Sequence, residues 1–357
     1  MTPAVNIPIQ NIYYLLCYAW DKLTEREVVA VNASDPITLA DLFARVLING
    51  INHLLKRGFD RGYVSQHEWT GRLRGRICFQ EAVRRNATVT GRLPCDFDEL
   101  SYNVLHNRIL KATMRRLIRT QGLAAECSEG LTQLCRLFSD IQDIELTNRL
   151  FGQVQIHRNN QFYDFLLKVC ALIYRNLLVT EKPGATKFMD FVQDEEQMAS
   201  LFEQFVRTFY RVHTNFQVKS EDIRWRWIPF DDFSKGLLPR MRTDISLASD
   251  SRKIIIDCKF TPKATQHHFE AEKLRSEHLY QINAYMDNLE GEWADTCEMM
   301  LLYPTVDRPL TADYTHKGHQ IRIRTLNLNQ PWQGIHRDLL ALIPGVLPSS
   351  PGPRPDA

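Results

Sequence analysis

The sequence lacks an excess of either charge, a long apolar run and an export segment. Its 357 residues include 44 lysines and arginines against 42 aspartates and glutamates, so the formal net charge is only +2. The net charge of the whole chain therefore does not indicate a nucleic-acid-binding protein. A role on DNA would have to rest on local clusters of charge. No apolar run reaches the roughly 20 residues needed to span a bilayer. The N-terminal residues lack a basic stretch followed by an apolar one. We expect a cytoplasmic protein without membrane contact.

Closely spaced cysteine pairs are also missing, although the chain has eight cysteines. None forms a C-x-x-C pair, and they are scattered through apolar segments at positions 17, 78, 95, 127, 135, 170, 258 and 297. Zinc sites and disulfide frameworks usually show recognisable cysteine spacings. We therefore predict reduced, mostly buried thiols, and neither zinc ligands nor disulfides.

The composition is that of an ordinary folded protein, with 44% hydrophobic and 24% charged residues. The length allows two domains of about 100–200 residues each. Helical spacing of apolar residues dominates the first half, interrupted by glycine-rich, strand-like runs, and strands prevail in the second half. We predict an α/β (α+β) protein with a helix-rich N-terminal region carrying β-hairpins over residues 1–185. A second domain follows over 186–347, with a disordered Pro/Gly/Ser-rich tail over 348–357.

A polar group of residues lies within MRTDISLASDSRKIIIDCKF, residues 241–260. Two strand-like runs flank a polar turn around Asp250, and the second run contains three consecutive isoleucines, as in a buried strand. Side chains alternate along a strand, so Asp257 and Lys259 point the same way. Folding the two runs as a hairpin about Asp250 brings Asp244 close to opposite Asp257. Two carboxylates and one ammonium group then meet at one edge of a sheet.

This group of residues suits the hydrolysis of a phosphodiester. A cation is needed to hold a nonbridging oxygen and to acidify the attacking water, and Mg²⁺ prefers one or two carboxylates together with waters and phosphate. Asp244, Asp257 and the backbone carbonyl of Cys258 are the predicted ligands. Lys259 is placed to orient or deprotonate the water and to stabilise phosphate charge. The alternative is an ordinary strand-end ion pair, because Asp-x-Lys is common by chance.

A predicted helix downstream contributes Gln281 and Tyr285, which are four residues apart and share a face. Without a site, Tyr285 would be a core aromatic and Gln281 its solvated neighbour. With the two aspartates and the lysine, this pair resembles the PD-(D/E)xK nuclease superfamily, and its RecB-like branch in particular. Thr243 stands at the position where the motif has proline. Of the motif residues, that proline contributes least to the chemistry. The resemblance implies a mixed central sheet flanked by helices and a catalytic role for both Gln281 and Tyr285.

Several longer stretches resemble the McrC family, the nuclease subunits of McrBC modified-cytosine restriction systems. They occur in order and span nearly the whole chain: IPIQNIYYLLCYAW (7–20), GRLRGRI (71–77), FDELSYNVLHNRILKATM (97–114), LLPRMRTDI (237–245) and IIIDCKF (254–260). The resemblance implies an endodeoxyribonuclease that works with an McrB-like AAA+ GTPase, and the partner reads modified cytosine in double-stranded DNA. This chain has no G-x-x-x-x-G-K-[ST] loop, which agrees with GTP binding by the partner.

The same resemblance implies that the N-terminal region docks into the partner ring and stimulates its GTPase. Arg72, Arg74 and Arg76 of the predicted hairpin are the candidate contacts, unless they only decorate an exposed hairpin.

Three other residues are candidates for the site. Glu203 occupies the position of an acidic helix residue that some relatives add to the metal site, although a solvated helix face explains it equally well. Arg224 and Arg226 alternate along a predicted strand close to the site, so they are candidates for contacting DNA phosphates.

Two other functions stay open at this point. An autonomous RecB-like nuclease would cut DNA with Mg²⁺ alone. A non-catalytic activator of an AAA+ GTPase would have no need of a nuclease centre, and the presence of Asp244, Asp257 and Lys259 together argues against it.

Overall fold

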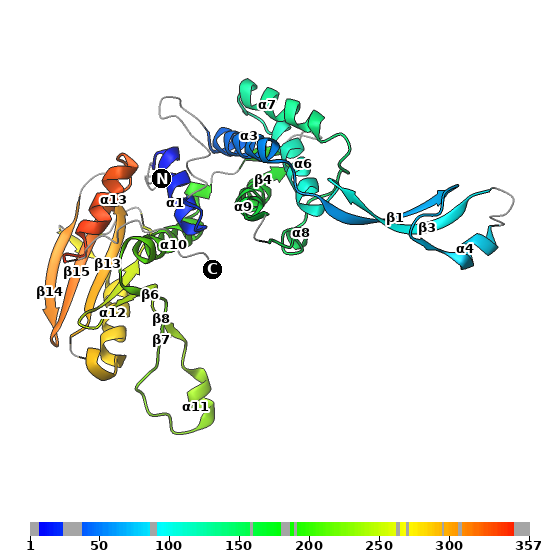
Figure 1. The fold of residues 1–357 in the computed structure, drawn as a ribbon. Coiled ribbons are helices and arrows are strands. Elements are labelled where there is room, and N and C mark those ends of the chain that lie inside the picture. Colours follow the sequence, from blue (N-terminus) through cyan, green and yellow to red (C-terminus); the bar gives the residue numbers. More distant parts are fainter. Residues whose placement is uncertain are drawn as a thin grey trace. The chain divides into compact units, whose positions relative to one another are not determined.

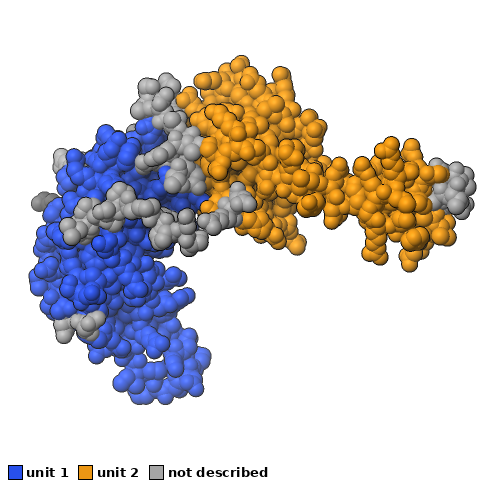
Figure 2. All heavy atoms as spheres, in the orientation of Figure 1, with its two compact units in different colours: residues 1–23, 190–357 blue, residues 24–189 orange. Residues whose placement is uncertain are grey.

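The computed structural model describes residues 7–23, 38–85, 91–157, 160–179, 186–188, 191–261, 265–268, 271–294, 296–305 and 309–345. The chain divides into unit 1, residues 1–23 with 190–357, and unit 2, residues 24–189 (Figure 2). The predicted tail at 348–357 lies outside the described residues. No helix in the described part of the chain is long and apolar enough to cross a membrane.

A six-stranded mixed sheet forms the centre of unit 1, in the order β14-β15-β13-β10-β9-β6 (Figure 1). Its central strands β10, β13 and β15 are parallel, while β6, β9 and β14 run antiparallel to their neighbours. The strands are β6 (Gln217–Lys219), β9 (Ile245–Ala248), β10 (Lys253–Cys258), β13 (Glu298–Thr305), β14 (Thr311–His316) and β15 (His319–Asn327). The expected mixed sheet flanked by helices is confirmed.

Helices cover both faces of this sheet because its central strands are apolar on both sides. On one face, Ile282 and Met286 of α12 (Ser276–Asn288) pack with Ile255 and Leu301. Helix α10 (Glu195–His213) contacts β10, and α13 (Trp332–Ala341) contacts β15. Smaller elements complete the unit: η2 (Phe191–Gln193), β7 (Asp222–Ile223), α11 (Asp232–Leu237), β8 (Met241–Arg242), β11 (Thr265–His268), β12 (Ala271–Leu274) and η3 (Gly291–Trp293).

The first helix, α1 (Ile9–Ala19), belongs to unit 1, although the sequence placed all of residues 1–185 in one region. Its apolar side packs on α10, where the rings of Tyr14 and Tyr18 lie 5.5 and 5.4 Å from that of Phe205. The Asn11 amide also donates to the carbonyl of Leu328, directly after β15, at 2.7 Å. The N-terminal helix is therefore part of the unit that carries the sheet.

Unit 2 is a helical body from which a three-stranded arm projects (Figure 1). The body consists of α3 (Leu39–Arg57), α6 (Leu105–Ile118), α7 (Ala125–Leu137), α8 (Asn148–Phe151) and α9 (Gln161–Asn176), with the short pair β4 (Leu177–Val179) and β5 (Thr186–Phe188). Thr38 and Asp41 form a capping box at the start of α3. Residues 62–101, here called the arm, contain β1 (Gly62–Thr70), β2 (Arg76–Ile77), α4 (Phe79–Arg84) and β3 (Leu93–Ser101), in sheet order β1-β3-β2.

A glycine is required where the arm doubles back into β2. Gly75 has a φ of 60°, and a Cβ there would lie 2.2 Å from the carbonyl oxygen of Asp96 on the neighbouring strand. No other residue type fits this close approach of two backbones.

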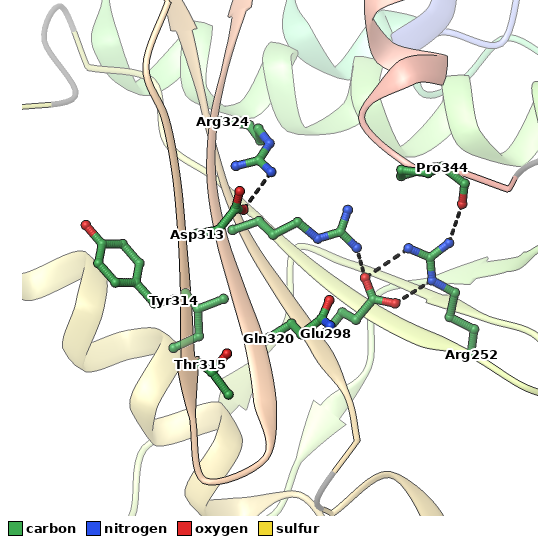
Figure 3. Close-up of a pocket in the computed structure, with 10 residues that line it drawn as sticks. Arg252, Glu298, Asp313, Tyr314, Thr315, Gln320, Arg324 and Pro344 are labelled. Atoms are coloured by element: carbon green, nitrogen blue, oxygen red, sulfur yellow. Dashed lines mark hydrogen bonds and ion pairs between the residues drawn. The ribbon is translucent and has the colours of Figure 1, made fainter.

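A pocket of about 480 Å³ lies at the β14 side of the sheet (Figure 3). Its centre is Glu298, which forms ion pairs with both Arg252 and Arg322. Arg252 also donates to the carbonyl of Pro344 at 2.7 Å, which ties the segment after α13 to the sheet. These charges satisfy one another, and none belongs to a predicted site residue. We therefore interpret the pocket as a structural ion-pair network.

The Glu298→Gln variant tests this interpretation. The Glu298 side chain is only 15% exposed, so its loss leaves two poorly solvated guanidinium groups without a carboxylate. We expect the free energy of unfolding to fall by about 3 kcal/mol, measured from urea midpoints. The control is Asp287→Asn, which removes an ion pair with Lys317 whose side chains are 45% and 58% exposed and should cost less than about 1 kcal/mol. Equal losses in the two variants would contradict the interpretation.

Candidate active site

The β9–β10 hairpin positions the two predicted aspartates. Its register pairs Ile245 with Ile256, and one further step along the same register sets Asp244 opposite Asp257. Paired residues of antiparallel strands point to the same face. The Asp244 carboxylate accepts a hydrogen bond of 2.8 Å from the backbone N–H of Cys258, which fixes one of its oxygens at the end of β10.

Asp257 is the fully buried member of the pair, with 0% of its surface exposed. Burial, and after it the negative charge of Asp244, raise the pKa of Asp257 to about 6. Burial also raises the pKa of Asp244, against the opposing effect of the Cys258 N–H. The protein therefore keeps two carboxylates together in a place that disfavours their charge.

Lys259 links this pair to helix α12. Its ammonium nitrogen lies 2.8 Å from Oδ2 of Asp257 and donates to Oε1 of Gln281 at 2.7 Å. The Gln281 amide donates to the Tyr285 hydroxyl at 2.7 Å, and that hydroxyl donates to the carbonyl of Arg242 at 3.0 Å. The hydroxyl also lies 3.4 Å from Oδ1 of Asp257. The structure thus brings together five predicted residues from three segments of chain.

The donor atoms at this site fit a hard divalent cation. Oδ2 of Asp257 is buried, and the ammonium group of Lys259 at 2.8 Å is the cation that lies beside it. Asp244 supplies a second carboxylate. Oxygen donors of this kind suit Mg²⁺ better than softer metals.

The Glu203 carboxylate forms an ion pair with Arg207, one turn later on α10. Arg207 also donates to the backbone carbonyl of Asp244 at 3.2 Å. Among the described residues, no hydrogen bond or ion pair joins the Glu203 carboxylate to either aspartate. Sequence reasoning missed Arg207, although its i+4 spacing from Glu203 was a usable indication.

Sequence reasoning also missed His278, in the first turn of α12. This side chain is buried and hydrogen-bonded to the Tyr303 hydroxyl at 2.9 Å. Burial, and then the nearby charge of Lys259, lower the pKa of His278 to about 4. The ring is therefore neutral at physiological pH beside the Lys259 ammonium group.

The predicted arginines lie outside this cluster. Arg224 and Arg226 are exposed and follow β7 in a loop, because the strand predicted to carry them ends at Ile223. The loop is held to α12 by a bond of 2.7 Å from the Arg226 N–H to Asn288. In unit 2, Arg72, Arg74 and Arg76 are all exposed on the arm, a placement that leaves their role untested.

The sequence also matches a known protein family. Residues 10–304 match the family model described as McrBC 5-methylcytosine restriction system component. The chain belongs to the McrBC family.

Two relatives of this McrBC family member are informative. The type IV methyl-directed restriction enzyme EcoKMcrBC of Escherichia coli (strain K12) is 32% identical over 335 residues, which covers 94% of this chain and 96% of the relative. A solved half-complex from the tetradecameric assembly of Thermococcus gammatolerans McrB AAA+ hexamers with bound McrC is similar in fold, with a TM-score of 0.60 and 17% identity. That match covers 94% of this chain and 76% of the other. At this identity it supports the fold alone.

The raised pKa of Asp257 predicts how the stability of this McrBC family member depends on pH when no metal is bound. A carboxyl group whose pKa rises from 3.8 to about 6 on folding favours the folded state when protonated. That contribution is lost as the pH rises through about 6. We expect Asp257→Asn to stabilise the chelated protein by about 1–3 kcal/mol at pH 8 and much less at pH 4, measured by thermal unfolding.

The matched control is Asp250→Asn, in the exposed turn of the same hairpin, which should show no such pH-dependent difference. If Asp257→Asn destabilises the protein more at pH 8 than at pH 4, the proposed origin of the raised pKa is wrong.

Proposed function

We propose that this chain is the DNA endonuclease subunit of a GTP-dependent, modified-cytosine-specific restriction complex. The observation that carries the proposal is the convergence of Asp244, Asp257 and Lys259 with Gln281 and Tyr285 of α12. Membership of the McrBC family supports the restriction role. The reaction is hydrolysis of a phosphodiester in double-stranded DNA.

Asp244, Asp257 and the backbone carbonyl of Cys258 would hold the cation, which we propose to be Mg²⁺. When bound, this ion would polarise the scissile phosphate and lower the pKa of an attacking water. Asp257 is held rigidly for this task, because β10 lies between two other strands of the sheet. The carboxylate pair is electrostatically unfavourable by itself, so a divalent cation is a suitable counter-charge.

Lys259 orients the attacking water and stabilises the charge that develops on the phosphate. The position of Lys259 depends on α12, because Gln281 accepts a hydrogen bond from its ammonium group. Tyr285 in turn accepts a hydrogen bond from the Gln281 amide and so fixes it. We assign Gln281 and Tyr285 the role of holding the ammonium group between substrate and Asp257. Glu203 acts on the site through Arg207, which binds the Asp244 backbone.

Arg224 and Arg226 are proposed to contact DNA. They lie on the segment between β7 and β8, which carries α11 at its far end (Figure 1). β8 leads directly into Asp244, so DNA bound by this segment would lie beside the catalytic pair. The segment also exposes three aromatic rings that can stack on bases, those of Trp227, Phe230 and Phe233, together with the aliphatic side chains of Ile228 and Leu237.

The partner is proposed to be an McrB-like AAA+ GTPase that recognises the modified cytosine and binds GTP. Two observations support it: the solved relative is McrC bound to McrB AAA+ hexamers, and this chain has no phosphate-binding loop of its own. Unit 2 is the proposed docking region, with Arg72, Arg74 and Arg76 of the arm as contacts to the partner.

Substitutions at the catalytic pair test the nuclease assignment. We expect Asp257→Ala and Lys259→Met each to lower cleavage of DNA with modified cytosine at least about 100-fold, in the presence of partner, GTP and Mg²⁺. Stimulation of the partner's GTPase should stay at the parent level, which shows that the complex still assembles. Asp250→Asn should cut as the parent does. Cleavage by a pure Asp257→Ala preparation would refute the site.

The same assay separates the other functions. Cutting by the isolated chain with Mg²⁺ alone would favour an autonomous nuclease. Stimulated GTPase without cutting by the parent complex would favour a non-catalytic activator.

Substitutions on the arm test the partner contact. Hydrogen bonds to charged groups contribute about 1.5–3 kcal/mol each, so replacing Arg72, Arg74 and Arg76 with alanine should lower GTPase stimulation at least tenfold at limiting chain concentration. The control replaces Arg136, Arg149 and Arg175, exposed arginines on the helices of unit 2, with the same change in net charge. A similar loss in both triple variants would point to overall charge and away from the arm.

A further inference from the structure

The arm has too little core to fix its own structure. Within its described residues, 62–85 and 91–101, only Ala82, Pro94 and Cys95 are buried. Isolated hairpins are marginally stable in water, and small scaffolds of this kind usually need a cross-link or a metal. The arm therefore has to be held together by something other than apolar burial.

Three metal-ligating side chains meet where the arm's elements join. His67 lies on β1, Cys78 lies between β2 and α4, and Asp96 lies on β3, directly opposite His67 in the strand register. Nδ1 of His67 is 2.6 Å from one Asp96 oxygen, and Sγ of Cys78 is 2.9 Å from the other. Nδ1 and Sγ are 4.0 Å apart. All three ligand atoms lie within 4.8 Å of one another.

The second ring nitrogen of His67 also contacts a carboxylate. Nε2 of His67 lies 2.8 Å from a carboxylate oxygen of Glu81, and the other oxygen of Glu81 accepts from the Trp69 indole at 3.3 Å. A proton on Nε2 satisfies Glu81 and leaves the Nδ1 lone pair directed at Asp96. In that tautomer the lone pair and the carboxylate repel. Either a second ring proton, which gives an imidazolium that donates to both carboxylates, or a metal ion between Nδ1 and Asp96 removes the repulsion. A metal-bound histidine characteristically has a carboxylate on its other nitrogen in this way.

We propose that His67, Cys78 and Asp96 form a binding site for Zn²⁺ on the arm. A thiolate, an imidazole and a carboxylate suit zinc and disfavour magnesium. With zinc–ligand distances of about 2.0–2.3 Å, tetrahedral ligands lie about 3.3–3.6 Å apart. To reach that spacing, the two distances to Asp96 open by about 0.6–0.8 Å and the Nδ1–Sγ distance closes by about 0.5 Å, changes that side-chain rotations allow. Water completes the fourth position, because the ligand atoms are partly exposed to solvent.

This site ties three elements with one ion. β1, the β2–α4 junction and β3 each contribute one ligand, so bound zinc fixes α4 against the strands. Cys78 therefore departs from the sequence-based expectation of uniformly non-ligating thiols. The prediction is independent of the nuclease proposal, because the site lies in the other unit.

Metal content of the full-length chain tests the site. The protein carries a histidine-free tag and Asp257→Asn, which weakens metal binding at the nuclease centre. It is stripped of metal, given one equivalent of Zn²⁺ and desalted, and zinc is counted by mass spectrometry. We expect about one zinc per chain, and at least tenfold weaker binding after Cys78→Ser or His67→Gln. Glu81→Gln, which alters only the carboxylate behind His67, should weaken binding about tenfold.

Cobalt provides a readout that does not depend on any variant folding. Co²⁺ bound to Cys78 should give a sulfur-to-metal charge-transfer band in the parent protein. The control Cys135→Ser alters the other half-buried cysteine of the chain, on α7, and should retain both zinc and the band. A parent protein without zinc and without the band would overturn the proposal, and so would a band that persists after Cys78→Ser. The first result would mean that protons alone hold the cluster, and the second that another cysteine binds the metal.

Discussion

Burying the Asp257 carboxylate at the end of an isoleucine strand costs free energy, and the surrounding elements compensate for that cost. Lys259 brings an ammonium group to Oδ2 at 2.8 Å, and Gln281 and Tyr285 of α12 hold that group in place. Asp244 adds a second carboxylate, fixed by the N–H of Cys258. The site holds two like charges close together on rigid elements. This combination is expected of a centre that binds a cation and a phosphate.

The site could be predicted from the sequence where the relevant distances are set by a single element or a short turn. Strand alternation places Asp257 beside Lys259, a hairpin turn places Asp244 opposite, and helix spacing joins Gln281 to Tyr285. Arg207 and His278 were not predicted, because their contacts depend on how α10 and α12 pack on the sheet. Strand propensity also misled at Arg224 and Arg226, where Trp225 instead bonds to the carbonyl of Pro239 at 2.6 Å.

The same distinction applies to the fold: features set by local sequence pattern were predicted, and features set by packing between distant segments were not. The change from helical to alternating patterns predicted the hairpin region and the strands of the second half, since both depend on local periodicity. The mixed order of the central sheet was expected only from the family resemblance. The position of α1 did not follow, because an amphipathic helix shows that one face is buried without showing which partner covers it. The cluster on the arm was equally hidden: His67, Cys78 and Asp96 are far apart in sequence, and the β1–β3 and β2–β3 pairings bring them together.

Because unit 1 is made of residues 1–23 and 190–357, unit 2 is an insertion within it. During synthesis, α1 emerges first but has no surface to cover until α10 follows, nearly two hundred residues later. Unit 2 ends at residue 189, just before α10 begins, and as a domain with its own core it can fold as the chain elongates. The apolar face of α1 has to be shielded meanwhile. The order of translation thus favours completion of the region proposed to dock on the partner before the residues of the proposed nuclease centre, Asp244 to Tyr285, have been made.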